Sequence, residues 1–273
     1  MSVAIGISTF VKRFEMFKSL VTDIRIRTDA PIMVMVNGEY GRPMDPNYRR
    51  DILGFCSRIP NVYPHVFPEF QSLAKLWNTM VLNAPTDHVW ILNDDVQFQP
   101  DGDPIPSIQA HIDAGNDLFY APWGWSHFVI GRAMLDILGY FDERLLGVGE
   151  EDGDMLWRYE AAFGKSIGEC LMPGVGNTYD FTQATDGIDT AYGNKTKFNT
   201  LFMFGRKYIH DGHGQRGIFG YPVRKVMRDA RQYPYERFRR DNMHLIGDTS
   251  HFNPDHPLPD FGGMKPWVST PEE

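Results

Sequence analysis

Apolar runs alternate with stretches of helical period along the first third of the chain. Residues 3–8, "VAIGIS", and residues 31–37, "PIMVMVN", are apolar and β-branched, which is the pattern of strands buried on both faces. Residues 12–25 between them place apolar side chains at helical spacing. These positions are Phe14, Phe17, Leu20, Val21 and Ile24. The pattern predicts a strand, a helix and a second strand.

The same alternation continues to residue 98. Residues 47–58 indicate a helix, and residues 61–67, "NVYPHVF", indicate a short strand interrupted by proline. Residues 69–82 predict a further helix, and the stretch 88–98, "HVWILNDDVQF", supplies a fourth strand that ends at its two aspartates. The apolar face of that helix consists of Leu73, Leu76, Trp77, Met80 and Val81. Strands that alternate with helices predict an α/β fold with a mostly parallel central sheet flanked by helices.

The second half of the chain is less regular. Residues 118–123 indicate a strand, and residues 127–141 a strand that runs into a helix. Residues 150–164 predict a helix that ends at Gly164. Its expected apolar positions are Met155, Leu156, Tyr159, Ala162 and Phe163. Residues 172–220 are rich in Gly, Asn, Thr and Asp, so loops are expected to dominate there.

Composition narrows the class of protein. With 42% hydrophobic and 23% charged residues, the 273-residue chain has the composition of an ordinary soluble globular protein. Its net charge of −8 argues against a general nucleic-acid binder. Two distant cysteines exclude a cysteine-based zinc site and predict no disulfide. Neither a signal peptide nor a transmembrane segment is recognisable, so we expect a soluble, cytoplasmic protein.

Two acidic clusters carry the candidate chemistry. Asp94 and Asp95 directly follow the fourth strand, where ligands bind in parallel sheets, and paired carboxylates there suit Mg²⁺ or Mn²⁺. The alternative is that they only begin a turn. Residues 150–154, "EEDGD", place acids at a helix start, which suits the helix dipole by itself. Alternatively, one of these carboxylates is a general base.

Both clusters, in this order, resemble the motifs of glycosyltransferases of the GT-A (Rossmann-like) fold, and most of all the inverting family 2 group. "LNDDV" is similar to the DXD-type motif, and "FVIGRAMLDILGYFDERLLGVGEEDGDMLWR" to the later family pattern. The resemblance covers about the first 215 residues. It implies a GT-A domain over residues 1–215, with a nucleotide-sugar half at about 1–100 and an acceptor half at about 101–215. A helical or extended C-terminal extension would then occupy residues 216–273.

The resemblance also implies roles for particular residues. Asp95 corresponds to the metal-binding carboxylate, and "YIHDGHGQ" would bring His210 or His213 to the metal or the diphosphate. Asp152 falls on the base that deprotonates the acceptor hydroxyl, with Glu151 beside it. We expect the pKa of Asp152 to stay near its ordinary value of about 4. The expected donor contacts are Ser8, Thr9, Phe10, Asn37, Glu39, Asn78, Asn93 and Asp94.

The implied activity is a metal-dependent transfer, with inversion, from a UDP-, GDP- or dTDP-linked sugar to an acceptor hydroxyl on a glycan, a lipid-linked glycan or a protein. Two alternatives stay open at this point. A nucleotidyltransferase that makes nucleotide sugars would need a glycine-rich basic loop after the first strand, and "STFVKRFEMF" has no glycine. A non-catalytic glycan-binding protein would keep the fold without the chemistry. A phosphatase of the haloacid dehalogenase type needs aspartates two residues apart, a spacing that "DDVQ" lacks.

Overall fold

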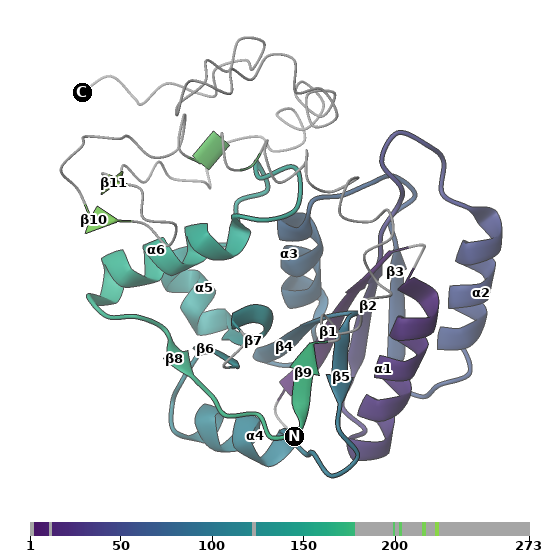
Figure 1. Cartoon of the computed structure of the whole chain (residues 1–273), viewed down its shortest axis with the longest axis horizontal. Coiled ribbons are helices and arrows are strands. Elements are labelled where there is room, and N and C mark those ends of the chain that lie inside the picture. Colours follow the sequence, from purple (N-terminus) through teal and green to yellow (C-terminus); the bar gives the residue numbers. More distant parts are fainter. Residues whose placement is uncertain are drawn as a thin grey trace. The chain divides into compact units, whose positions relative to one another are not determined.

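The computed structural model describes residues 3–10, 13–121 and 124–177, together with residues 199, 202 and 203 and the backbone of two short strands (Figure 1). Those strands are β10 (Gln215–Arg216) and β11 (Pro222–Val223), which pair antiparallel. Almost all of the predicted C-terminal extension, residues 216–273, lies outside the described residues. None of the described helices is long and apolar enough to cross a membrane.

The chain separates into two compact units. The first consists of Met1–Gln71, Leu76–Ile137 and Ser166–Ala184, and the second of Ser72–Lys75, Leu138–Lys165 and Thr185–Glu273. The predicted division into residues 1–215 and 216–273 stays a prediction. The first unit contains the central sheet, and the second contains the acidic helix start.

A seven-stranded sheet forms the centre of the first unit, in the order β3-β2-β1-β4-β7-β6-β8. Its strands are β1 (Val3–Thr9), β2 (Ile32–Val36), β3 (Val62–Val66), β4 (His88–Asn93), β6 (Leu118–Ala121), β7 (Gly124–Gly131) and β8 (Gly168–Glu169). Four pairs are parallel, and β7 runs antiparallel to both of its neighbours. The predicted α/β fold with a mostly parallel sheet and flanking helices is confirmed. Pro64 is tolerated in β3 because β3 is an edge strand.

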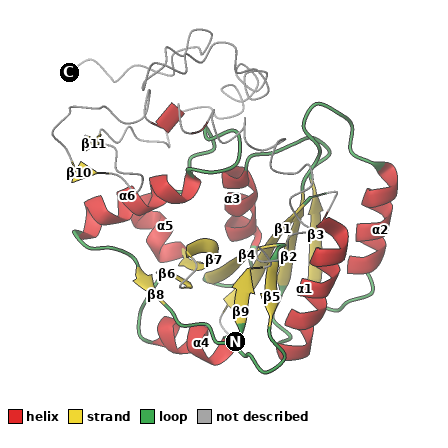
Figure 2. Cartoon of the chain, in the orientation of Figure 1, coloured by secondary structure: helices red, strands yellow, loops and turns green. Residues whose placement is uncertain are grey.

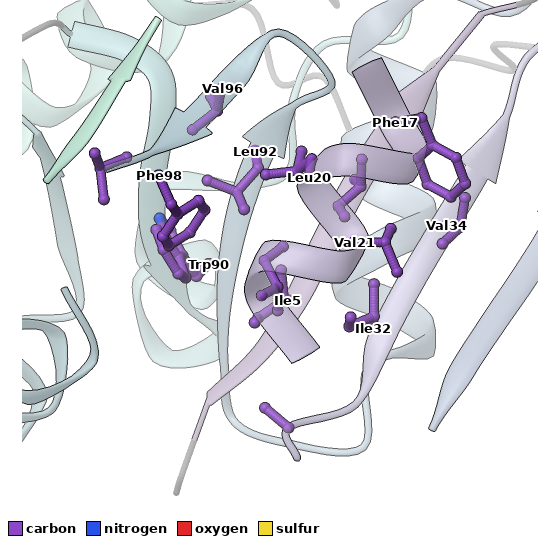
Figure 3. Close-up of a cluster of buried hydrophobic side chains, with 14 of the residues drawn as sticks. Ile5, Phe17, Leu20, Val21, Ile32, Val34, Trp90, Leu92, Val96 and Phe98 are labelled. Carbon is purple, nitrogen blue, oxygen red and sulfur yellow. The ribbon is translucent and has the colours of Figure 1, made fainter. Parts of the chain in front are cut away.

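One face of the sheet is covered by α1 (Phe14–Arg27) and α2 (Pro46–Cys56), whose arrangement can be followed in Figure 2. Figure 3 shows Phe17, Leu20 and Val21 of α1 packed against alternate residues of the strands, such as Ile5 and Ile32. All four of the predicted core positions from Phe17 to Ile24 are buried. The apolar stripe of α1 therefore fixes this layer, as its helical period predicted.

The opposite face of the sheet is covered by α3 (Leu73–Asn83). Gly6 of β1 allows this close approach, because a Cβ at that position would lie 2.6 Å from the sulfur of Met80. Trp77 packs edge-on against Phe128 of β7, with 4.9 Å between ring centroids. All five apolar residues predicted for this helix face are buried. The sheet is thus buried on both faces, as its continuous apolar strands predicted.

Three parts of the fold differ from the expectation or add to it. Helix α3 begins at Leu73, four residues later than predicted. Strand β5 (Val96–Phe98) follows β4 and pairs antiparallel with β9 (Val175–Asn177), which lies in the region expected to be loop. Helix α4 (Ile105–Asp113) comes after β5. Gly102 and Gly174 close the β5–β9 ribbon, because a Cβ on Gly102 would lie 2.3 Å from the Cα of Gly174.

The described part of the second unit is dominated by α6 (Glu151–Phe163). The helix ends at Gly164, which has a φ of 66°, as the sequence predicted. Its buried apolar face includes Trp157, whereas Ala162 and Phe163 are exposed, so the predicted face was wrong at its C-terminal end. Residues 161–163, in the last turn of α6, are all exposed.

Candidate functional site

The carboxyl ends of β1, β2 and β4 bring several predicted donor contacts together. Ser8 of β1 lies opposite Asn93 of β4 in the parallel register, and the amide of Asn37 donates to the carbonyl of Thr9 at 3.0 Å. Ser8, Thr9 and Asn37 are buried. Because parallel strands end at the same edge, these polar side chains follow the apolar strands at one edge of the sheet, where α/β proteins bind ligands.

Asp94 and Asp95 are buried in the turn that follows β4, with exposures of 1% and 5%. A cation meets them there: Nη1 of Arg13 lies 2.8 Å from Oδ1 of Asp94 and 3.3 Å from Oδ2 of Asp95. Arg13 precedes α1 directly, so the parallel pairing of β1 with β4 brings it to residues 81 positions away in the sequence. The sequence pattern did not single out Arg13, although the basic pair "KR" after the first strand was a signal for it.

Each of the two carboxylates has a second oxygen that Arg13 does not bind. Oδ2 of Asp94 and Oδ1 of Asp95 are buried and have no hydrogen-bond partner among the described residues. Burial raises the pKa of Asp94 to about 6; Arg13 and the hydroxyl of Thr9 oppose this increase, and Asp95 reinforces it. Buried carboxylate oxygens without donors are costly, and they are the kind of ligand that a hard divalent cation binds.

The two aspartates fit a metal only as part of a larger set of ligands. Among the described residues, no group of three or more His, Cys, Asp and Glu side chains gathers closely enough to hold an ion. The predicted ligands His210 and His213 lie outside the described residues. A metal held by Asp94 and Asp95 would need further ligands beyond these two carboxylates.

Asn37 has a structural role at the end of β2. Its Nδ2 donates to the carbonyl of Gln71 at 2.9 Å, and its Oδ1 accepts from the amide of Gln71 at 2.8 Å. The backbone of Gly38 passes so close to Glu69 that a Cβ at Gly38 would lie 2.4 Å from its carbonyl carbon. These contacts hold residues 69–71 in place before α3. A donor contact by Asn37 stays a prediction.

The other expected donor contacts lie in different surroundings. Glu39 forms an ion pair with the side chain of Arg42. Asn78 is buried on α3, with 3% exposure, and Phe10 is half-buried just after β1. Their roles toward a donor stay predictions.

The turn that leads into α6 is held by Asn199 in the second unit. Its Oδ1 accepts from the amide of Gly147 at 3.0 Å, and its Nδ2 donates to the carbonyl of Gly149 at 2.6 Å. Gly149 and Glu150 both have positive φ, of 97° and 72°. Glu150 thus adopts a left-handed conformation that is unusual for a residue with a side chain. Nothing in the sequence pattern pointed to Asn199.

The acidic residues of α6 are not equivalent. Asp154 is fully buried and binds Nη2 of Arg158 at 2.8 Å, while Nη1 of Arg158 donates to the carbonyls of residues 138–140. Asp154 and Arg158 therefore stabilise the loop before α6. Glu151 is buried, and its Oε1 accepts from the amide of Gly149 at 3.0 Å. Asp152 is half-buried, and its Oδ1 accepts from the amide of Gly153 at 2.8 Å.

Among these three acids, Asp152 is half-buried, whereas Glu151 and Asp154 are buried. Burial raises the pKa of Asp152, opposed by hydrogen bonds from the backbone amides of Gly153 and Asp152 itself. The expectation of an ordinary pKa was therefore wrong. A carboxylate with a raised pKa is a stronger base and suits general base catalysis near neutral pH.

Replacing Glu151 by glutamine is expected to stabilise the protein above neutral pH. Burial and the neighbouring Asp152 raise the pKa of Glu151 well above its ordinary value, and its Oε2 is buried without a partner among the described residues. The unfolded chain loses this proton near pH 4.3. Stability therefore falls as the pH rises from there toward the raised pKa, and glutamine removes this loss.

Thermal melts from pH 4 to pH 8 test this expectation. The melting temperatures of Glu151→Gln and the wild type should coincide at pH 4 and diverge in favour of the variant as the pH rises. Glu169→Gln is the matched control, because Glu169 is exposed. A lower melting temperature of Glu151→Gln at pH 8 would show that the ionised carboxylate is stabilising.

No protein-family model and no curated protein matches the sequence. Among solved structures, similarity is found to residues 1–349 of S. aureus TarS, with 14% identity and a TM-score of 0.46 over 63% of this chain and 58% of that one. A TarS complex with UDP-GlcNAc is 13% identical, with a TM-score of 0.46 over 63% of this chain and 56% of that one. The mannosyltransferase PcManGT from Pyrobaculum calidifontis, in complex with GDP-Man and Mn²⁺, is 13% identical. Its TM-score is 0.48 over 63% of this chain and 56% of that one. The similarity spans less than two thirds of each of these chains and, at these values, assigns this chain to no family.

Proposed function

We propose that the protein is a metal-dependent glycosyltransferase that transfers a sugar from a nucleoside-diphosphate sugar to an acceptor hydroxyl, with inversion. The observation that carries the proposal is the buried pair Asp94 and Asp95 at the carboxyl end of β4. It stands in the place where α/β proteins bind ligands, and two of its oxygens have no partner among the described residues. The choice of sugar transfer as the reaction rests on the DXD-type and later motifs, which resemble those of family 2 of the GT-A glycosyltransferases.

The negative charge of the two aspartates is the reason that the proposal includes a metal ion. Asp94 and Asp95 carry two negative charges and Arg13 one positive charge, so the group as a whole is negative when ionised. A diphosphate brought to this edge adds further negative charge. A bound Mg²⁺ or Mn²⁺ would neutralise the charge that builds up on the departing nucleoside diphosphate. Asp95 and Asp94 would supply two of its ligands, with His210 or His213 as a further candidate.

Asp152 is the proposed general base. Its carboxylate is half-buried at the start of α6 and is held by the amide of Gly153. It would take the proton from the acceptor hydroxyl as that oxygen attacks the anomeric carbon opposite the leaving group, which inverts the configuration. Glu151 is less suited to this role because it is buried, whereas Asp152 is half-buried.

A thermal-shift screen with UDP-, GDP-, dTDP- and CMP-linked sugars, each with and without Mn²⁺, tests the donor half of the proposal. A ligand at 100 times its Kd stabilises the folded state by about 2.7 kcal/mol, or about 5 to 10 °C in a domain of this size. We expect such a shift for one nucleotide class, and only with metal. Asp95→Asn should abolish it because a metal ligand is lost.

Asp101→Asn is the matched control, since Asp101 is exposed six positions further along the chain. It should leave the shift unchanged. A metal-dependent shift that survives in Asp95→Asn would remove the metal role from Asp95. No shift with any of the sugars would contradict the proposal and favour the non-catalytic glycan-binding alternative.

A further inference from the structure

Arg13 occupies the position in which a cation would neutralise Asp94 and Asp95. A single nitrogen, Nη1, lies within 3.3 Å of both carboxylates, and the arginine side chain is only 15% exposed. A guanidinium does not lose its proton in proteins, so this positive charge is permanent. The pair of aspartates therefore has a counter-ion supplied by the chain itself.

The neutralisation by Arg13 is incomplete. One positive charge faces two carboxylates, and the buried oxygens Oδ2 of Asp94 and Oδ1 of Asp95 have no partner among the described residues. A divalent cation would balance both charges. A metal and the guanidinium bound together on the same two carboxylates would instead leave a surplus of positive charge, so the two cations compete.

We infer that Arg13 is an exchangeable counter-ion, which a divalent metal displaces from Asp94 and Asp95 and which then binds the diphosphate of the donor. The inference rests on the proposed function for the identity of the donor. Arginine is suited to the second role because its planar fork matches the oxygens of a phosphate group. Arg13 is also close to the place where the diphosphate would bind, because it lies at the same edge of the sheet as the two aspartates that follow β4.

The exchange has a thermodynamic consequence. Metal alone must displace Arg13 and leave its guanidinium without the two carboxylates, which weakens metal binding. A nucleoside diphosphate gives the displaced guanidinium a new partner, so metal and nucleotide should each strengthen the binding of the other. By linkage this coupling is the same in both directions.

Titration with Mn²⁺ alone, followed by the electron paramagnetic resonance signal of the free ion, tests the displacement. At pH 8, Arg13→Gln should bind Mn²⁺ at least about tenfold more tightly than the wild type, because the competing charge is gone. Arg50→Gln is the control, since it makes the same change in charge at an exposed position of α2. Arg13→Lys keeps the charge and should bind Mn²⁺ much as the wild type does, which also guards against misfolding of the glutamine variant.

A second titration in saturating UDP, and then in GDP, tests the new partner. The nucleotide that binds should tighten Mn²⁺ binding by the wild type by roughly 5- to 150-fold, the usual range of such coupling. The gain should be several-fold smaller in Arg13→Gln, and also smaller in Arg13→Lys, which lacks the fork. Equal or weaker Mn²⁺ binding by Arg13→Gln, or an unchanged gain, would overturn the inference.

The two proposals fail in different ways. Tighter Mn²⁺ binding by Arg13→Gln, without any response to UDP or GDP, would uphold the displacement and contradict the proposed donor. Nucleotide binding that needs no metal and is lost in Arg13→Gln would show that Arg13 is the permanent cation of the site, which overturns the exchange. No Mn²⁺ binding by either protein would overturn both the exchange and the metal role.

Discussion

Replacing Asp152 by asparagine is expected to lower kcat by about 10² to 10⁴, the usual contribution of a general base. Asparagine keeps the size of the side chain and an oxygen for the amide of Gly153, so α6 should begin as before. It cannot accept the proton of the acceptor. The metal-dependent thermal shift with the donor should persist, which separates loss of chemistry from loss of binding.

The pH profile gives this expectation a second measurement. Because burial raises the pKa of Asp152, kcat of the wild type should rise with pH through a value above the ordinary 3.9 or so of aspartate. The rise should be absent from the residual activity of Asp152→Asn. Asp136→Asn, an exposed change on α5 (Arg132–Leu138), should behave as the wild type. Retained turnover in Asp152→Asn would assign the base to another group.

The largest expected effect on stability comes from Asp142→Ala. Asp142 and Arg144 are almost completely buried, and the guanidinium binds both carboxylate oxygens, at 2.7 and 2.5 Å. Removing the carboxylate that binds a buried guanidinium on both oxygens costs about 3 to 5 kcal/mol. The free energy of unfolding from urea titration should fall by that amount.

Asp51→Ala provides the contrast for this measurement. Asp51 and Arg50 also form an ion pair, but their side chains are 50% and 70% exposed. Loss of such a surface pair should change the free energy of unfolding by less than about 1 kcal/mol. Similar losses in the two variants would mean that burial does not decide the strength of the pair at Asp142.

The layers of the fold follow from the sequence because their signals are local. Phe17, Leu20 and Val21 recur at helical spacing, and the strands beside them are apolar throughout. The predicted start of α3 was wrong because of contacts with residues distant in the sequence. Asn37 and Gly38 hold residues 69–71 in a non-helical path. Similarly, β9 is a strand because β5, almost 80 residues earlier, pairs with it.

The candidate site shows the same limit. Asp94 and Asp95 could be placed at the end of a strand from the pattern of β4 alone. Their partner Arg13 could not be found in that way, because only the pairing of β1 with β4 brings it near. Asp154 and Arg158 match the family pattern, yet they bind each other and the carbonyls before α6. A motif therefore identifies important residues, but it does not distinguish residues that take part in the reaction from residues that stabilise the fold.

The contact between Gly102 and Gly174 has a consequence for tracing the ancestry of the chain. Each backbone occupies the space that a side chain on the other would need, since a Cβ on Gly174 would lie 2.2 Å from the Cα of Gly102. Neither position can accept alanine while the β5–β9 ribbon keeps its path. Homologues that share the ribbon should therefore retain both glycines, and those that have replaced either one should have lost this path of the ribbon. Such a pair can mark distant relatives whose remaining sequence has diverged beyond recognition.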